Sequence, residues 1–333
     1  MRCTSPLYRV NDYVVKSDNC PTLFRKKRFF GYRDYLDLVN RKGYNESDFT
    51  RLNCGQCLNC RILHSKQWAE RCVLEASFHK HNYFLTLTYD DVNLPYSECG
   101  VPTLRKRDFQ LFCKRLRNHL DFRYFAVGEY GDKTYRPHYH AIFFGLDLSD
   151  LVLYKTVYRK GKLYAYYNSL LLNEVWGKGF VVITEATPES CAYTARYCLK
   201  KVGFNTNVDL NLHRLYDPNL SDDEFHKGLQ GIGAIEPIFS LMSRKPGIAR
   251  NYYELNKDII YDIDNIPMST LKHLRYFDKL YEVEQPTKIQ GIKENRLQTV
   301  AVIDERLRSN YSEEEYSNVQ RENSKLKKEF RGN

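Results

Sequence analysis

The chain has 333 residues, which is long enough to bury the core of one enzyme-sized domain with appendages, or of two domains. Lys and Arg number 51 against 41 Asp and Glu, and the net charge of +10 favours a polyanionic partner, most simply nucleic acid. No apolar run approaches the ~20 residues that span a bilayer, and the N-terminus lacks the apolar core of a signal peptide. We therefore expect a cytoplasmic protein with no membrane partner, whose ten cysteines are thiols or metal ligands rather than disulfides.

The first part of the chain contains two predicted helices and one strand. Residues 1 to about 50 are polar and aromatic, show no clear periodicity, and are expected to be irregular. A helix is predicted from about Cys57 to His79, and the β-rich run FLTLTY at 84–89 predicts a strand. A basic helix follows, and its apolar residues repeat at steps of three and four: Phe109, Phe112, Leu116 and Leu120.

The next part predicts a sheet that leads into one more helix. Strands are predicted at 124–128, 138–145 and 180–186, with a tyrosine-rich insertion or hairpin at 154–167. A helix then begins at Pro188, and its signals are Thr187 as the N-cap and Gly203 as the stop.

This order of elements predicts the α+β class. We expect a central antiparallel sheet backed by helices, in a split β-α-β arrangement with N-terminal and C-terminal extensions. The expected segments are an N-terminal extension (1–50), a core that includes the cysteine-rich helix (51–205), an accessory region (206–285) and a charged tail (286–333).

The stretch His138-Tyr139-His140 is the first candidate site. In a strand, residues two apart point to the same face, so the two imidazoles project side by side. Glu129 ends the preceding strand and lies close to them if the two strands form a hairpin. Two imidazoles and a carboxylate can bind one metal ion and leave positions open for water or a phosphate oxygen. The alternative is a pair of ordinary polar residues at the start of a strand.

The helix from Pro188 supplies candidate nucleophiles. Tyr193 and Tyr197 are four residues apart and share one helical face, in a segment that Arg196 and Lys200 make basic. A phenol is a poor nucleophile at neutral pH, since its ordinary pKa is ~10. A metal-polarised phosphodiester and nearby cations would let it attack phosphorus. The alternative is a tyrosine pair that packs on the sheet.

The cysteines offer a second metal site. Cys54, Cys57, Cys60 and Cys72 could bind a structural zinc ion, but the first three are denser than paired C-x-x-C motifs, and no second pair follows. Buried packing thiols are the alternative. Further along, Arg244 and Lys245 flank a Pro-Gly turn, which is either a DNA-backbone contact or a surface turn.

The motifs together resemble a known family. FLTLTYDD, GEYGDKTYRPHYHAIFFG and YTARYCLKK follow the order of the three motifs of HUH rolling-circle replication endonucleases. They are most similar to the replication initiators of gokushovirus-type microviruses, which are small single-stranded DNA bacteriophages. CGQCLNCRILHSKQWAERCVLEA and FSLMSRKPGIARNYYE also resemble that family, so the resemblance covers roughly residues 50 to 255.

The resemblance implies an enzyme that nicks the viral-strand origin, forms a 5′-phosphotyrosine link, and later rejoins the displaced strand into a circle. It implies that His138, His140 and Glu129 bind Mg²⁺ or Mn²⁺ and that Tyr193 and Tyr197 are the nucleophiles. Arg196 occupies a position that often carries Lys in the family, so the charge is kept while a Lys-specific proton transfer is in doubt.

The expected partners are single-stranded and origin DNA, together with a host helicase and a host DNA polymerase, in the cytoplasm of a bacterial host. The helicase is expected because the chain has no G-x-x-x-x-G-K-[ST] phosphate loop. Three alternatives stay open. One is a plasmid initiator or transposase of the same superfamily. The others are a non-catalytic nucleic-acid-binding protein with a cysteine metal site and a metal-dependent hydrolase without a covalent step.

Overall fold

The computed structural model of the chain describes residues 3–296, except for residue 4 and for 18–19, 160, 201–220, 222–224, 227, 230–232 and 263–273; at 159 and 198–200 it describes the backbone alone. The chain divides into two compact units, Met1–Ala249 and Arg250–Asn333. Among the described helices, none is both long enough and apolar enough to cross a membrane. The division of the chain at residues 50, 205 and 285 stays a prediction.

The N-terminal segment is folded, so the expectation of an irregular stretch is wrong. Strands β1 (Leu7–Val10), β2 (Phe29–Gly31) and β3 (Phe49–Leu52) form an antiparallel sheet in the order β2-β1-β3. Helices α1 (Asp12–Lys16), α2 (Thr22–Lys26) and α3 (Tyr32–Asn40) and the 3-10 turn Glu46–Asp48 connect the strands. Their buried core consists of Val10, Cys20, Phe24, Phe30, Tyr35, Leu38 and Phe49. Elements of three to nine residues contain too few repeats for periodicity to show in the sequence.

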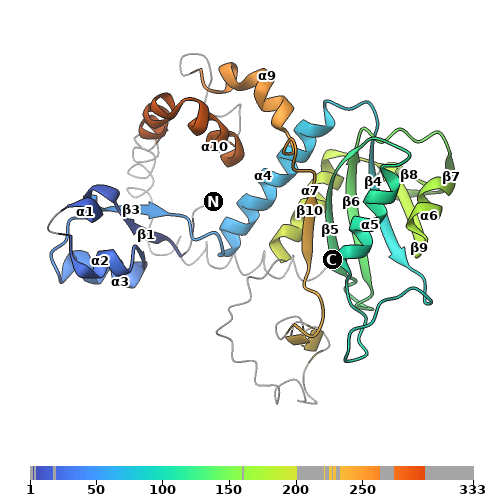
Figure 1. Cartoon of the computed structure of the whole chain (residues 1–333), viewed down its shortest axis with the longest axis horizontal. Helices are drawn as coiled ribbons and strands as arrows, with labels where there is room; N and C mark the ends of the chain where they lie inside the picture. The colour runs from blue at the N-terminus through green and yellow to red at the C-terminus, as the bar shows by residue number, and fades with distance from the viewer. Residues whose placement is uncertain are drawn as a thin grey trace. The chain divides into compact units, whose positions relative to one another are not determined.

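The main sheet has seven strands, and all neighbouring strands are antiparallel (Figure 1). In spatial order they are β10 (Phe239–Met242), β5 (Arg123–Tyr130), β6 (Pro137–Phe144), β4 (Asn82–Tyr89), β9 (Gly179–Glu185), β8 (Lys162–Ser169) and β7 (Leu151–Arg159). The helices of this part are α4 (Leu58–Ala76), α5 (Lys106–Leu116), α6 (Leu170–Trp176) and α7 (Pro188–Lys200). The predicted α+β class is confirmed, and the tyrosine-rich stretch is the hairpin β7–β8.

Two helical layers cover the two faces of the sheet, because the strand side chains alternate between two apolar clusters. On β6, Tyr139 and Phe143 join a core that includes residues of α5 and α6. Ile142 and Phe144 join a second core that includes Cys72 of α4 and residues of α7. Figure 1 shows α4 and α7 together on one side of β5 and β6. His138 and His140 have the parity of Ile142, which places them on the α4–α7 face.

Gly179 is the position where β9 approaches the end of β4 most closely. It pairs with Tyr89, its φ is +145°, and a Cβ there would meet the Thr88 carbonyl oxygen and lie 2.6 Å from the Asp90 nitrogen. We expect Gly179→Ala to lower the free energy of unfolding by about 2–3 kcal/mol, since it adds both backbone strain and a backbone clash. Urea denaturation checks this value. Gly31→Ala is the control, because nothing lies within 4 Å of its Cβ position; equal losses would contradict the prediction.

The second unit contains helices α9 (Arg250–Ile260) and α10 (Arg275–Glu284), and residues 286–296 are also helical. Tyr261 and Tyr281 stack with ring centroids 3.9 Å apart, and the Tyr261 hydroxyl donates to Asp278 at 2.9 Å. Aromatic stacking therefore joins α10 to the residue that follows α9. The rest of the predicted charged tail, 297–333, lies outside the described residues, as does the predicted helix stop at Gly203.

Candidate active site

Three predicted metal ligands meet on adjacent strands. In the pairing of β5 with β6, Glu129 lies directly opposite His138, and His140 follows two residues later on the same face. The Nε2 atoms of His138 and His140 each lie 3.0 Å from Oε1 of Glu129. The ligand atoms of the three residues are all within 4.8 Å of one another. The two imidazoles and the carboxylate thus converge on one point.

The opposite ring nitrogens hold the imidazoles in position. Nδ1 of His138 lies 3.1 Å from the Arg136 carbonyl oxygen, and Nδ1 of His140 lies 3.1 Å from the Thr86 hydroxyl. The Phe84 ring stacks on His140 with centroids 5.3 Å apart. Such contacts orient a histidine so that its other nitrogen faces the ligand. Our sequence analysis missed Thr86 and Phe84, although the alternation of FLTLTY places them together on one face.

Glu129 stays ionised although it is only 3% exposed. Burial opposes the charge, but hydrogen bonds and positive charge from His138 and His140 outweigh it and hold the pKa of Glu129 below its ordinary value. A buried carboxylate beside two imidazoles is a set of charges that a cation would stabilise. Nitrogen and oxygen donors of these types suit Mg²⁺ or Mn²⁺. The three residues therefore fit a divalent metal ion, with Glu129 and the two Nε2 atoms as its ligands.

The tyrosine pair lies on the same face as the histidines. Helix α7 begins after Thr187, whose hydroxyl accepts from the Ser190 amide at 3.2 Å, as predicted for its N-cap. The ring of His140 lies 5.3 Å from that of Tyr193 and 5.7 Å from that of Tyr197, between centroids. The Tyr197 hydroxyl donates to the Tyr193 oxygen at 2.5 Å. Phenols and imidazoles that are more than fifty residues apart in the chain are thus neighbours.

The two tyrosines differ in accessibility. Tyr193 is 40% exposed and Tyr197 is 7% exposed. Burial, the charge of Glu129 and the hydrogen bond to Tyr193 raise the pKa of Tyr197 well above its ordinary value, so its phenol is neutral at physiological pH. Arg196 is exposed on the same helix. The side chain of Lys200 lies outside the described residues, so its expected role stays a prediction.

The predicted cysteine site needs one correction. Cys54, Cys57 and Cys60 do lie together, but Cys72 is fully buried in the core between α4, α7 and the sheet. The fourth cysteine of the cluster is Cys3. No disulfide links any of the described cysteines. Helical spacing put Cys72 on the same stripe as Cys60, yet one helix cannot bring residues twelve apart to one point, since each residue adds 1.5 Å of rise.

The basic turn after β10 is exposed at Arg244 and Lys245. Its backbone is anchored below, because Arg123 donates to the Pro246 carbonyl at 2.7 Å and Arg71 donates to the Ile248 carbonyl at 3.0 Å. A firmly held turn with exposed cations is compatible with a DNA-backbone contact, which stays a prediction.

Comparison with known proteins places the chain in a family. A family model for replication-associated proteins of the ORF2 type matches residues 82–202. The replication-associated protein ORF2 of Spiroplasma virus 4 is 34% identical over 285 residues, which cover 78% of this chain and 80% of that protein. The chain belongs to this family of replication-associated proteins. The resemblance predicted from the motifs is thereby confirmed.

Two further replication-associated proteins are similar over a shorter range. VP4 of Bdellovibrio phage phiMH2K is 32% identical over 174 residues, covering 49% of this chain and 53% of that protein. ORF4 of Chlamydia phage 1 is 35% identical over 184 residues, covering 53% of this chain and 45% of that protein. No solved structure matches the chain. The segment 82–202 runs from β4 to the end of α7 and contains Glu129, both histidines and both tyrosines.

Proposed function

We propose that this protein initiates rolling-circle replication of a circular phage DNA by nicking the viral strand through a tyrosine. The observation that supports this most directly is that α7 presents Tyr193 and Tyr197 to the face holding His138, His140 and Glu129. The His140 ring lies within 5.7 Å of both tyrosine rings. A metal-binding cluster and a nucleophile must be this close to act on one phosphodiester.

The roles of the cluster follow from its contacts. His138, His140 and Glu129 would hold Mg²⁺ or Mn²⁺, which when bound would polarise a phosphodiester oxygen and offset developing negative charge. Thr86 and the Arg136 carbonyl keep both Nε2 atoms turned toward Glu129. These two groups act through the histidines, so they are positioning groups.

Tyr193 is assigned to the first attack because it is the more exposed phenol. Its oxygen forms a bond to phosphorus and loses its proton, while the P–O3′ bond breaks and the departing oxygen gains a proton. The products are a 5′-phosphotyrosine and a free 3′-hydroxyl. Arg196, exposed on the same helix, attracts the DNA backbone by its charge.

The second phenol serves the joining step. Tyr197 donates its proton to the Tyr193 oxygen, and it can attack the regenerated origin once Tyr193 carries the DNA. The released 3′-hydroxyl then attacks the first phosphotyrosine and closes the displaced strand. The phosphotyrosine bond conserves the energy of the cleaved bond, so closure needs no ATP. A host DNA polymerase extends the 3′-hydroxyl, and a host helicase separates the strands.

A covalent-adduct assay tests this function. The protein is incubated with Mn²⁺ and origin oligonucleotides labelled at either end, then denatured and run on a gel. We expect the 3′-label to move with the protein and the 5′-label to appear in a shorter free product, because the new 5′ end is the one held. Release of both ends unattached would indicate a water nucleophile, and binding without cleavage would indicate a non-catalytic binding protein.

Tyrosine variants identify the nucleophiles in the same assay. The double change Tyr193→Phe with Tyr197→Phe should abolish the adduct, since a phenyl ring has no oxygen to attack with. Tyr193→Phe alone should lower first cleavage more than Tyr197→Phe, whereas Tyr197→Phe should mainly lower joining. Tyr158→Phe, at a tyrosine 72% exposed on β7, is the control and should match the unchanged protein. An adduct that persists in the double variant would rule out this pair.

A further inference from the structure

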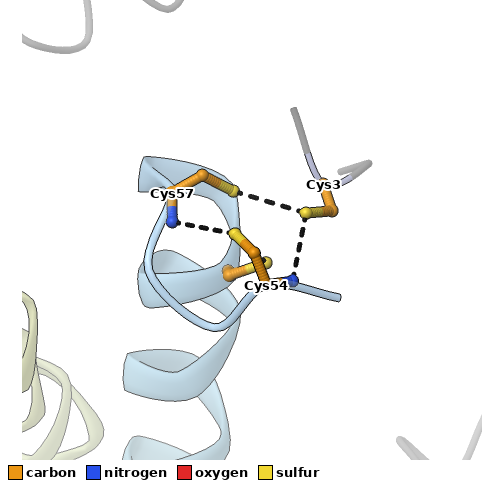
Figure 2. Close-up of side chains that lie close together, drawn as sticks. Cys3, Cys54 and Cys57 are labelled. Atoms are coloured by element: carbon orange, nitrogen blue, oxygen red, sulfur yellow. Dashed lines mark hydrogen bonds between the residues drawn. The ribbon is translucent and has the colours of Figure 1, made fainter. Parts of the chain in front are cut away.

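A second cluster of metal-binding groups lies outside the proposed active site. The sulfur atoms of Cys3, Cys54, Cys57 and Cys60 are all within 4.8 Å of one another. Figure 2 shows Cys3, Cys54 and Cys57 with their sulfur atoms turned toward one another at the start of α4. The Cys3 and Cys57 sulfurs are 3.8 Å apart, and those of Cys54 and Cys60 are 4.0 Å apart.

These distances distinguish between the chemical states open to four thiols. A disulfide needs sulfur atoms about 2.05 Å apart, so none of these pairs is bonded. A tetrahedral zinc site with Zn–S bonds of about 2.3 Å places its sulfur atoms about 3.8 Å from one another. The spacings of 3.8 Å and 4.0 Å match the zinc geometry.

The backbone around the cluster donates to the sulfur atoms. The Cys57 amide donates to Cys54 Sγ at 3.2 Å, and the Cys54 amide donates to Cys3 Sγ at 3.3 Å. Gly55 has φ +74°, a left-handed conformation that suits glycine and lets the chain turn between Cys54 and Cys57. Cys57 is the N-cap residue of α4, where the helix dipole favours negative charge. These features stabilise thiolates, which are the form that binds a metal.

The pairing of two strands far apart in sequence brings the fourth cysteine into place. Strands β1 and β3 are antiparallel, and Leu7 at the start of β1 is opposite Leu52 at the end of β3. The chain ends that extend beyond this pair therefore emerge side by side, one leading back to Cys3 and the other on to Cys54. The cluster joins the residues before β1 to the first turn of α4.

We propose that Cys3, Cys54, Cys57 and Cys60 bind one structural zinc ion that attaches the N-terminal three-stranded sheet to the start of α4. Four thiolates are the soft ligands that zinc prefers, and four protein ligands leave no position for a substrate. Each thiol releases its proton to solvent as it binds. The site is independent of the proposed nicking activity, because none of its residues belongs to the histidine and tyrosine cluster.

Metal content measures this site directly. The full chain, purified without chelator from zinc-supplemented cells, should contain one zinc ion per molecule by mass spectrometry of the elements. The measurement is made on the His138→Ala and His140→Ala double variant as well, so that zinc bound to the histidine cluster is not counted. Cobalt substituted for zinc should give the strong visible absorption of a tetrahedral tetrathiolate. A folded protein with neither zinc nor this absorption would overturn the proposal.

Cysteine variants identify the ligands. Cys3→Ser and Cys54→Ser should lose the zinc and the cobalt spectrum, whereas Cys72→Ala and Cys99→Ser should keep both. Cys99 is the exposed control, and Cys72 tests the ligand set that helical spacing suggests. If the serine variants do not fold, chelator treatment of the unchanged protein replaces them: loss of zinc should make residues 1–53 more sensitive to limited proteolysis. Zinc retained in Cys3→Ser, or bound zinc without any effect on proteolysis, would contradict the site or its structural role.

Discussion

Replacing His140 with alanine is expected to lower the rate of origin nicking at least about 10²–10³-fold, the cost of removing one electrostatic stabiliser from an active site. His140 is 7% exposed, lies against Glu129 through Nε2, and is flanked by both tyrosine rings. Its loss removes a metal ligand and the packing partner of the nucleophiles together. His138→Ala should have a similar effect, since it removes the other imidazole from the same point. Single-turnover cleavage of labelled DNA with Mn²⁺ measures the rates.

Two control variants separate chemistry from folding and binding in this experiment. His119→Ala changes an exposed histidine after α5 and should leave the nicking rate unchanged. Thr86→Val keeps the shape of a residue that touches Nδ1 of His140, and should lower the rate about 10–100-fold, as loss of an outer-shell contact does. Fluorescence anisotropy should show DNA binding retained in all of these variants. Nicking by His140→Ala at more than a tenth of the normal rate would exclude His140 from the site.

The second large effect is expected on stability. Glu75 of α4 is 2% exposed and accepts from the Arg123 guanidinium and the Ala249 amide. Glu75→Ala leaves a mostly buried guanidinium without its counter-charge and an amide without its acceptor. Breaking a buried pair in this way typically costs about 3–5 kcal/mol. We expect urea denaturation of Glu75→Ala to show a loss of that size, which would loosen the turn that presents Arg244 and Lys245.

The pair can be tested by a double-mutant cycle. Removing Arg123 together with Glu75 should cost less than the sum of the single changes, because neither charge is then left alone. Glu98→Ala, at an exposed glutamate in a loop, is the control and should change stability little. A loss below about 1 kcal/mol in Glu75→Ala, the size of a surface ion pair, would show that the carboxylate is dispensable.

Local geometry made much of the main sheet and part of the site predictable. The alternation in FLTLTY and HYHAIFF predicted strands, and it put His138 and His140 on one face because side chains two apart in a strand point the same way. Thr187 and Pro188 predicted the start of α7, and four-residue spacing placed Tyr193 and Tyr197 together. The basic charge and the motif order pointed to the family. All of these signals lie within a few residues of the groups they describe.

Only the tertiary structure decided how these local pieces meet. Strand register set Glu129 opposite His138, and helix packing put the tyrosines over the histidine face rather than the opposite one. The pairing of β1 with β3 selected Cys3 over Cys72 for the cysteine cluster, and side-by-side packing of short elements gave the N-terminal residues a core of their own. Periodicity reports which way a side chain points from its own helix or strand. Which distant side chain it meets depends on backbone pairing and burial summed over the whole domain, and no short stretch of sequence contains that sum.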